Sequence, residues 1–398
     1  SLKFKVILFG FIFTFFSSFG QSYFLGLFNS SIREALSITH GQFGSIFASA
    51  TLCSSLLLIW VGKKIDDVNI FKFAFFVTIL LSFACFFFSR ITSVFLLFIG
   101  IFLMRFSGQG MMSHTASTTI SRYFTRTRGR ALSISWFGLS SAEFVMPVLM
   151  VYLLTIIDWQ NLWIIFSITV LIVLPIVSFL LIKNLNLDSR EANDENKKEV
   201  EIKQWKRREV IKDYRFYIIS SNMLAMPWIF TGFAVFQSFV QTSKGWGPYV
   251  IAQSFMSYSI FSVLTLFLSG FLIDKYSSRK LLIYMNIPLL LSVIVLFSFD
   301  TPVTAFVFLG LVGISNGFAN ILGSSTWAEL YGVKYLGSIK ALTTALMVFA
   351  TAFGTALFGY LIDTGFTVGD IAVVSGTYIF ISLILLFFVR KKLNPVII

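Results

Sequence analysis

Apolar runs of about 20 residues recur along the whole chain, separated by shorter polar segments. A helix of that length crosses a hydrocarbon core of about 30 Å. Strands of a membrane barrel would be about ten residues long and would alternate in polarity, which these runs do not do. The pattern therefore predicts an all-α membrane protein with many spanning helices.

Composition agrees with this class. Of 398 residues, 57% are hydrophobic and 12% are charged, whereas a soluble protein carries about 25% charged residues. The net charge of +13 could indicate nucleic-acid binding, but the basic residues lie in short loops between apolar runs. That distribution is typical of a membrane protein and orients it, so we expect a lipid bilayer and no nucleic acid as a partner.

Twelve spans are predicted, with ends uncertain by about four residues. They are 6–28, 42–61, 70–89, 93–118, 131–157, 162–183, 216–242, 248–271, 280–299, 302–326, 339–362 and 371–390. Six lie on each side of one long polar stretch, so we expect an N-terminal bundle (1–183), a cytoplasmic linker (184–215) and a C-terminal bundle (216–398). The linker is interpreted either as a solvated connection or as a surface helix over 200–210, with Ile202 and Trp205 in the membrane interface.

The basic residues predict the orientation. Placing both termini in the cytoplasm leaves three basic residues in outer loops, namely Arg33, Arg90 and Lys244. The inner loops then hold most of the others, including Arg122, Arg126, Arg128 and Arg130. This excess predicts a multi-pass protein of the cell (inner) membrane with both termini cytoplasmic.

The two halves are internal repeats. Equivalent stretches occur in the same order at offsets of a little over 200 residues. They are Gly62–Asp66 and Gly270–Asp274, Gln21–Tyr23 and Gln237–Phe239, and Ile156–Asp158 and Leu361–Asp363. Parallel repeats of six helices are the plan of one large class of transporters.

These motifs carry a family resemblance. The segment GFLIDKYSSRK (Gly270 to Lys280) resembles the loop motif of the major facilitator superfamily. The first copy of this motif begins at Gly62 and matches less well, because Asp67 and Asn69 replace a basic residue and a glycine. Arg105 and the glycines after it resemble that superfamily's span 4 motif. The resemblance covers essentially the full chain. It implies two pseudo-symmetric six-helix bundles that rock around a central site, and secondary active transport rather than an enzymatic reaction.

Two further segments resemble bacterial relatives of the monocarboxylate and oxalate–formate carriers, namely Gly20–Gly44 and Glu329–Asp363. This implies a small organic anion, a monocarboxylate or short dicarboxylate, as the substrate. Those carriers usually place a cation in span 8 or span 11. Here span 8 has none before Lys275 and span 11 has only Lys340 at its edge, so a neutral or zwitterionic solute stays open.

Arg105 in span 4 and Glu143 in span 5 are the charges that fall deepest in hydrocarbon. A charge at that depth costs at least about 2.5–3.5 kcal/mol, which favours a functional reason for it. The two lie roughly 18 and 21 Å from the outer ends of their helices, at 1.5 Å per residue. They could form a permanent ion pair. Alternatively, a substrate anion competes for Arg105, and Glu143 takes a proton when it is released.

Uncharged polar residues complete the candidate sites. Gln21 in span 1 and Gln237 in span 7 could bind substrate or join helices by hydrogen bonds. Tyr23 beside Gln21, and Asn316 and Asn320 on one face of span 10, are further candidate substrate-binding residues. His114 follows Arg105 on the opposite helix face. It is interpreted either as a packing residue bonded to Ser or Thr or as a proton relay.

The loop motifs predict gating residues, namely Gly62, Asp66, Gly270, Asp274 and Arg279. Their aspartates could meet helix N-termini or basic side chains and latch an inner gate. The small-residue pairs Gly313/Gly317, Ala350/Gly354 and Gly138/Ala142 predict close helix packing.

The chain therefore predicts a monomeric proton-coupled symporter or exchanger of a small organic anion. It contains no phosphate-binding loop, no Cys–His metal cluster and no nucleophile–base arrangement, so we expect no enzyme activity and no cofactor. One alternative is an exporter of hydrophobic or cationic compounds that uses Glu143. Another is a transporter-like receptor that binds a ligand without moving it.

Overall fold

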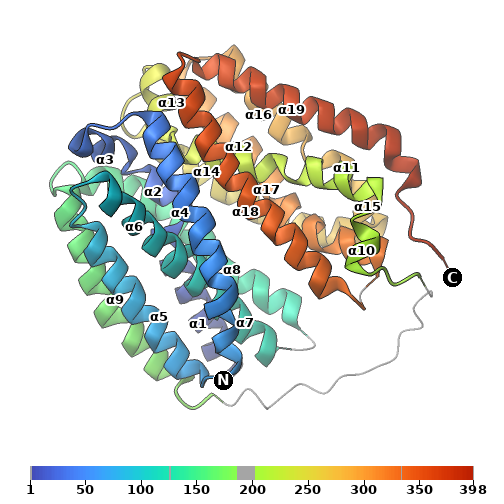
Figure 1. The fold of residues 1–398 in the computed structure, drawn as a ribbon, viewed down its shortest axis with the longest axis horizontal. Coiled ribbons are helices and arrows are strands. Elements are labelled where there is room, and N and C mark those ends of the chain that lie inside the picture. Colours follow the sequence, from blue (N-terminus) through green and yellow to red (C-terminus); the bar gives the residue numbers. More distant parts are fainter. Residues whose placement is uncertain (1, 125–126, 186–201, 333, 398) are drawn as a thin grey trace. The chain divides into compact units, whose positions relative to one another are not determined.

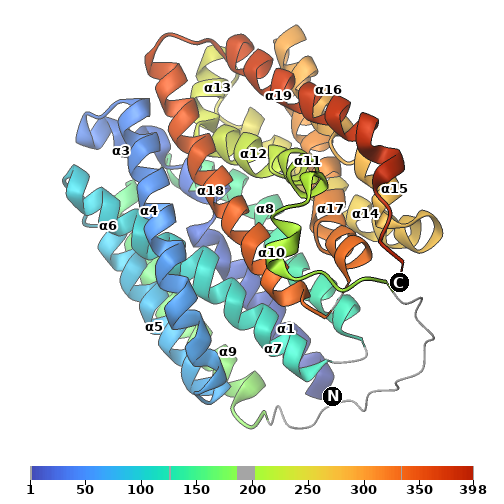
Figure 2. The same ribbon diagram turned by 45° about the vertical axis from the view of Figure 1, so that its right-hand side comes forward.

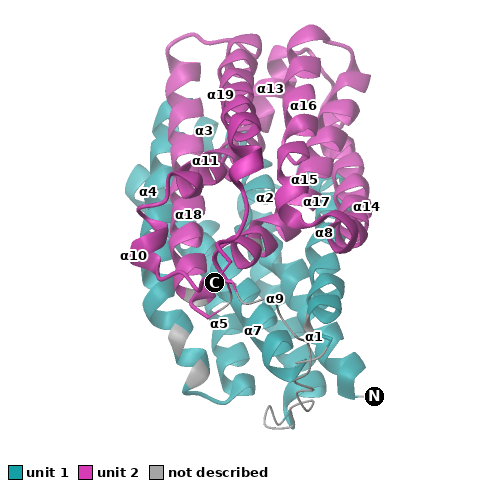
Figure 3. Ribbon diagram, turned by 90° about the vertical axis from the view of Figure 1, so that its right-hand side faces the viewer, with its two compact units in different colours: residues 1–195 teal, residues 196–398 magenta. Residues whose placement is uncertain are grey.

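The chain forms two compact units in the computed structural model, which describes residues 2–124, 127–185, 202–332 and 334–397. The side chains of a few helical residues, including Asp66 and Arg128, also lie outside the described part. Unit 1 is Ser1–Glu195 and unit 2 is Asn196–Ile398, coloured separately in Figure 3. The boundary between the units falls within the polar stretch 184–215 that we expect to be the linker.

Twelve helical segments in the described residues are long and apolar enough to cross a membrane. They are Leu2–Gly26, His40–Val61, Ile70–Phe88, Val94–Tyr123, Gly129–Leu153, Trp159–Ile182, Tyr214–Val235, Val250–Tyr276, Ser278–Ser298, Pro302–Tyr331, Ser338–Asp363 and Val368–Lys392. They are numbered here as spans 1 to 12. The predicted number of spans and the all-α fold class are thus confirmed.

In unit 1, span 1 packs against span 5, span 2 against span 4, and span 3 against span 6. Figure 1 shows the third of these pairs, α5 beside α9. The elements are α1 (Leu2–Phe16), η1 (Ser17–Gly20), α2 (Ser22–Gly26), α3 (Asn29–Leu36), α4 (His40–Val61), η2 (Gly62–Asp66), α5 (Ile70–Phe88), α6 (Val94–Met104), η3 (Arg105–Met112), α7 (Ser113–Tyr123), α8 (Arg128–Leu153) and α9 (Trp159–Ile182).

Unit 2 repeats this arrangement, since span 7 packs on 11, span 8 on 10 and span 9 on 12. Its spanning elements are labelled in Figure 2. The elements are α10 (Arg207–Val210), α11 (Tyr214–Met223), α12 (Ala225–Val235), α13 (Gln237–Ser243), α14 (Val250–Tyr276), α15 (Ser278–Leu281), η4 (Leu282–Tyr284), α16 (Ile287–Ser298), α17 (Pro302–Tyr331), α18 (Leu336–Asp363), α19 (Val368–Val389) and η5 (Arg390–Lys392).

Glycines let the paired helices touch at their backbones. A Cβ on Gly138 would overlap the Phe11 carbonyl, and one on Gly354 would overlap the Trp228 carbonyl, so spans 1/5 and 7/11 approach in the same way. In spans 8/10, a Cβ on Gly317 would lie 2.6 Å from the Ser262 carbonyl oxygen. The predicted packing role of these glycines is therefore confirmed.

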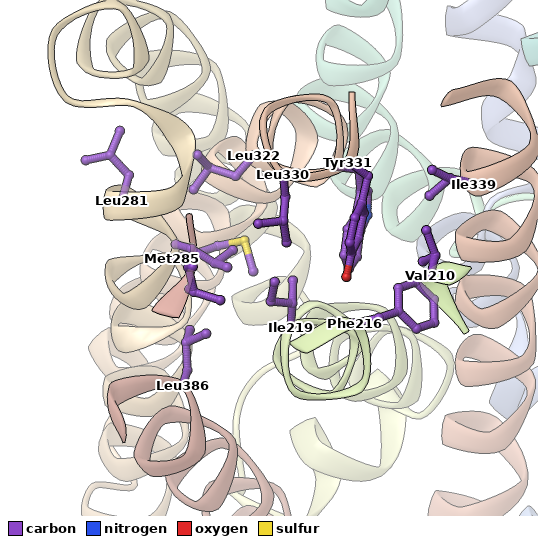
Figure 4. Close-up of a cluster of buried hydrophobic side chains, with 13 residues drawn as sticks. Val210, Phe216, Ile219, Leu281, Met285, Leu322, Leu330, Tyr331, Ile339 and Leu386 are labelled. Carbon is purple, nitrogen blue, oxygen red and sulfur yellow. The ribbon is translucent and has the colours of Figure 1, made fainter. Parts of the chain in front are cut away.

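We call the end of each unit that carries the loops after its second and fourth spans the basic end. In unit 2 this end is filled by an apolar cluster (Figure 4). The cluster joins α10, α11, α17, α18, α19 and the C-terminal segment, through buried residues such as Val210, Phe216, Trp327, Ile339 and Leu393. Burying such side chains stabilises this end by roughly 1.5–3 kcal/mol for each large residue.

The last part of the polar stretch 184–215 lies against the basic end of unit 2. Ile202 forms an antiparallel bridge with Ile397, and the Lys203 N–H donates to the Val396 carbonyl at 2.7 Å. The Trp205 N–H donates to the Tyr331 carbonyl at 3.0 Å. These partners hold 202–206 extended, and the helix covers only Arg207–Val210. The surface-helix interpretation is therefore wrong for 202–206; residues 200 and 201 lie outside the described residues.

Candidate substrate site

Span 1 is interrupted where the polar side chains begin. Helix α1 passes into η1, Gln21 is extended with ψ 151°, and α2 starts at Ser22. An extended residue interrupts the regular helix ladder, so the Gly20 carbonyl is open to another donor. In unit 2 the helix breaks at the equivalent point, just past the end of span 7, because α12 ends at Val235 and α13 begins at Gln237.

Span 4 changes its winding at Arg105, since Arg105–Met112 is a π-helix. π-Helical turns are uncommon and often occur at functional sites. Here the π-helix packs directly against η1. A Cβ on Gly108 would lie 2.7 Å from the Gly20 nitrogen, so two glycines are needed for this contact. The interruption in span 1 and the π-helix in span 4 thus meet beside Arg105.

Arg105 is buried, with 2% of the residue exposed, and its contacts come from spans 1 and 2. Nη1 donates to the Gly20 carbonyl at 2.9 Å and to the Ser22 hydroxyl at 3.3 Å. Nε donates to the Thr51 hydroxyl at 3.2 Å, and the guanidinium carbon lies 5.2 Å from the centre of the Phe47 ring. All four partners are uncharged. Nη2 makes no hydrogen bond with a residue that the structure describes.

Glu143 is also buried, at 8% exposed, and it lies within electrostatic range of the buried Tyr23. It forms no ion pair with Arg105, so the permanent pair is not what the structure contains; the arginine is held by uncharged groups instead. Pro147 lies inside α8 four residues later and has no N–H to bond the Glu143 carbonyl. Span 5 thus carries a buried carboxyl one turn before a proline that cannot donate to its backbone carbonyl.

His114 lies at the basic end of unit 1. Its Nε2 is 2.8 Å from the Gly62 carbonyl, and Nη1 of Arg122 donates to the Ile65 carbonyl at 3.2 Å. Span 4 therefore holds the turn after span 2 by two backbone contacts. The expected Ser or Thr partner of His114 is replaced by a glycine carbonyl. The Asp66 side chain, a predicted gating group, lies outside the described residues.

The three candidates in unit 2 differ in partners and in burial. Gln237 is buried and donates from Nε2 to the Ala234 carbonyl of the preceding turn at 2.8 Å. Asn316 is half-buried and donates to the Ser262 hydroxyl at 2.7 Å, which joins spans 8 and 10. Asn320, four residues further along span 10, is exposed. Asn316 thus makes an interhelical hydrogen bond, the kind that we considered only for Gln21 and Gln237.

The gating residues of unit 2 have unequal surroundings. Arg279 pairs with Glu329 at 3.4 Å and donates to the Leu393 carbonyl at 2.9 Å. Asp274 is exposed and makes no hydrogen bond or ion pair with a described residue, whereas the Glu329 carboxylate accepts from the N–H groups of Ser278 and Arg279 at the start of α15. The gating role of Asp274 stays a prediction. A Cβ on Gly270 would meet nothing within 4 Å.

Sequence patterns missed several contacts that shape these sites. Thr51 and Phe47 in span 2 and Ser22 in span 1 hold Arg105, and Glu329 holds Arg279. Ser22 lies beside Gln21 and could have been found from the repeat; the others carry no distinguishing local signal. In the described part of the chain, no group of three or more His, Cys, Asp or Glu residues could hold a metal ion.

Comparisons with known proteins agree with this architecture. A sequence model described as the Major Facilitator Superfamily matches residues 10–256 and 218–397. A bacterial homologue of the human lysosomal transporter Spinster has a similar fold, with a TM-score of 0.74, 13% identity, and coverage of 99% of this chain and 98% of that one. The nucleoside transporter NupG gives a TM-score of 0.69, 15% identity and 99% coverage of both chains. A search of curated proteins finds no match.

The two matches to the family model together reach all twelve spans, and both structural relatives are covered along nearly their full length. At 13–15% identity the structural likeness establishes the fold, and the family model establishes membership. The chain therefore belongs to the Major Facilitator Superfamily, as a multi-pass membrane transporter.

Proposed function

We propose that this protein is a secondary transporter that moves a small organic anion across the cell membrane by alternating access. The observation that carries the proposal is the state of Arg105, a buried cation whose described hydrogen-bond partners are all neutral. A monocarboxylate or short dicarboxylate fits this chemistry.

Neutral oxygens orient the guanidinium without cancelling its charge. A lone charge at this depth is costly, and an incoming carboxylate supplies both the missing counter-charge and acceptors for Nη2. Hydrogen bonds to charged groups contribute about 1.5–3 kcal/mol each. Thr51, Ser22 and the Gly20 carbonyl would keep the guanidinium in place between transport events, which lowers the ordering cost of binding.

We also propose that Glu143 exchanges the coupling proton. Its carboxyl is buried and forms no ion pair with a described residue, and the Tyr23 hydroxyl is its polar neighbour in span 1. An ionised carboxylate without a partner is unfavourable in a low-dielectric environment, so uptake and release of a proton can be linked to the arrival of the anion. With both termini in the cytoplasm, this gives an anion–proton symporter or exchanger.

A counterflow assay in proteoliposomes tests the proposal. Purified protein is reconstituted and challenged with labelled monocarboxylates, short dicarboxylates, amino acids, nucleosides (because of the likeness to NupG) and organic cations. We expect carboxylates to exchange and to compete with one another. Arg105→Gln should abolish this exchange, while Arg90→Gln, which removes an equal charge from an exposed loop residue, should leave it intact. Exchange of carboxylates that persists in Arg105→Gln would contradict the proposal.

A second candidate is an exporter of apolar cations. The observation that favours it is that Glu143 has no cationic partner among the described residues, so a cationic compound could neutralise it. The two candidates differ in their sensitive residue. In an exporter, Glu143→Gln abolishes transport and Arg105→Gln is mild; in an anion carrier, Arg105→Gln is the severe variant.

A further inference from the structure

The Arg105 guanidinium uses only part of its hydrogen-bonding capacity. An arginine carries one N–H on Nε and two on each Nη. Here Nε donates to the Thr51 hydroxyl, and Nη1 donates to the Gly20 carbonyl and the Ser22 hydroxyl. The two N–H groups of Nη2 have no acceptor among the residues that the structure describes. An anion that enters the site therefore finds its free donors on Nη2.

A carboxylate commonly contacts an arginine through both oxygens, which requires two neighbouring nitrogen atoms. Nη2 shares one edge of the guanidinium with Nε and the other with Nη1. Thr51 accepts at the first of these edges, while Gly20 and Ser22 accept from the nitrogen of the second. A two-oxygen contact therefore requires one of these three acceptors to give way.

Ser22 is the acceptor that is held least firmly. The Gly20 carbonyl lies 2.9 Å from Nη1 and belongs to backbone that is packed against span 4, since a Cβ on Gly20 would overlap the Met104 carbonyl. Thr51 is 2% exposed. The Ser22 hydroxyl is half-buried and lies 3.3 Å from Nη1, beyond the usual range of about 2.7–3.2 Å, and it makes no other hydrogen bond with a described residue.

We propose that Ser22 is a substrate-binding residue whose hydroxyl reverses its role when the anion arrives. In the structure this hydroxyl accepts from Arg105. Beside a bound carboxylate it turns and donates to a carboxylate oxygen, while Nη1 and Nη2 make the two-oxygen contact. A serine hydroxyl can take either role, because it carries one donor and two acceptor positions and rotates freely. The inference rests on the anion proposed for Arg105 and adds a second group that recognises it.

The role reversal predicts the sign of a mutational effect. If Ser22 only competed with the anion for Nη1, removal of its hydroxyl would free that nitrogen and tighten binding. If the hydroxyl donates to the bound anion, its removal weakens binding, since hydrogen bonds to an ionised acceptor are stronger than those between neutral groups. The direction in which KM changes therefore distinguishes the two roles.

The test measures the concentration dependence of counterflow in proteoliposomes. Labelled acetate, lactate and succinate are the probes, and KM is compared for the one that the wild type exchanges fastest. Ser22→Ala should raise KM at least about tenfold and change the maximal rate less than about twofold. Ser22→Thr keeps a hydroxyl and should stay within about threefold of the wild type. Ser31→Ala removes a half-buried hydroxyl from α3 and is the matched control, expected to behave like the wild type.

The outcomes separate this inference from the proposed function. If the wild type exchanges carboxylates and Ser22→Ala has an equal or lower KM, the role of Ser22 is overturned and anion transport stands. If the wild type exchanges none of the three probes, anion transport fails and the role of Ser22 fails with it. A KM for Ser22→Thr as high as that of Ser22→Ala would assign the loss to packing and overturn the hydroxyl's role. If Ser22→Ala lowers the melting temperature, Ser22→Cys takes its place, because a thiol of similar size is only a weak donor.

Discussion

Unit 1 and unit 2 pair their spans alike but place charge differently. In unit 1, Arg105 and Glu143 lie in the middle of their spans, both buried and not paired with each other. In unit 2, charges at the basic end are neutralised: the buried Arg215 pairs with Asp213 at 2.8 Å, and the partly exposed Arg279 pairs with Glu329 at 3.4 Å. The same arrangement of helices thus uses charge to join segments in unit 2, whereas in unit 1 the two buried charges have no counter-ion among the described residues.

The two units also share a break in the helix at equivalent positions. Span 1 is interrupted at Gln21, and in unit 2 the helix breaks after span 7 and resumes as α13 at the equivalent Gln237. In unit 1 the Gly20 carbonyl accepts from the Arg105 guanidinium, whereas in unit 2 the Gln237 side chain donates to the Ala234 carbonyl at the end of α12 and borders a small apolar pocket. The repeat therefore supplies a common backbone break, and the side chains around it decide which chemistry it serves.

The largest expected effect is that replacing Arg215 lowers stability, whereas replacing Arg105 lowers transport. Arg215→Gln leaves Asp213 buried without its ion partner and should lower the free energy of unfolding by about 3 kcal/mol. Arg105→Gln removes no ion pair and should change the melting temperature little, yet lower carboxylate exchange at least about 100-fold. Melting curves and counterflow rates check both. Equal loss of stability in the two variants would remove the distinction between the units.

The next effect tests what the units have in common. Gly138→Ala and Gly354→Ala each force a Cβ onto a backbone carbonyl of the paired helix, so both should destabilise their unit by about 1–3 kcal/mol. Gly129→Ala and Gly270→Ala are the matched controls, because a Cβ there meets nothing within 4 Å. Thermal melts of the four variants measure this. A large loss at one glycine of the pair but not at the other would contradict symmetric packing.

Glu143→Gln should change how transport depends on pH. If Glu143 carries the proton, uptake by the wild-type protein rises as the outside becomes more acidic. The rise in uptake is at most about tenfold per pH unit, and the variant loses it. Anion exchange in the absence of a pH gradient should persist in the variant. Uptake driven by a proton gradient is the measurement. An unaltered pH profile would assign coupling to another group.

The smallest effect concerns the pair at the basic end of unit 2. Arg279 and Glu329 are 22% and 27% exposed, so solvent screens their attraction. Glu329→Gln should lower stability by about 1 kcal/mol or less and leave exchange unchanged. Chemical denaturation checks the first expectation and counterflow the second. A variant that folds normally but no longer transports would show that this pair takes part in gating, as the loop motif predicts.

Helix count and class followed from local pattern, because apolar length alone decides whether a segment can span a bilayer. The glycines at 138, 317 and 354 were identified as packing positions for a related reason: close helix contact needs small residues whatever the partner is. The extended path of 202–206 could not be predicted, since its hydrogen-bond acceptors lie near residue 331 and in the C-terminal segment, far away in the sequence.

The sequence by itself determined the twelve spans, the duplication and the presence of two charges where hydrocarbon is expected. Only the tertiary structure decided that Arg105 is held by Gly20, Ser22 and Thr51 rather than by Glu143. The physical reason is that depth along a helix can be counted from residues, whereas the direction of a side chain depends on winding and on neighbours. Here the π-helix at Arg105 determines the winding, and the interruption at Gln21 determines which neighbours the side chain meets.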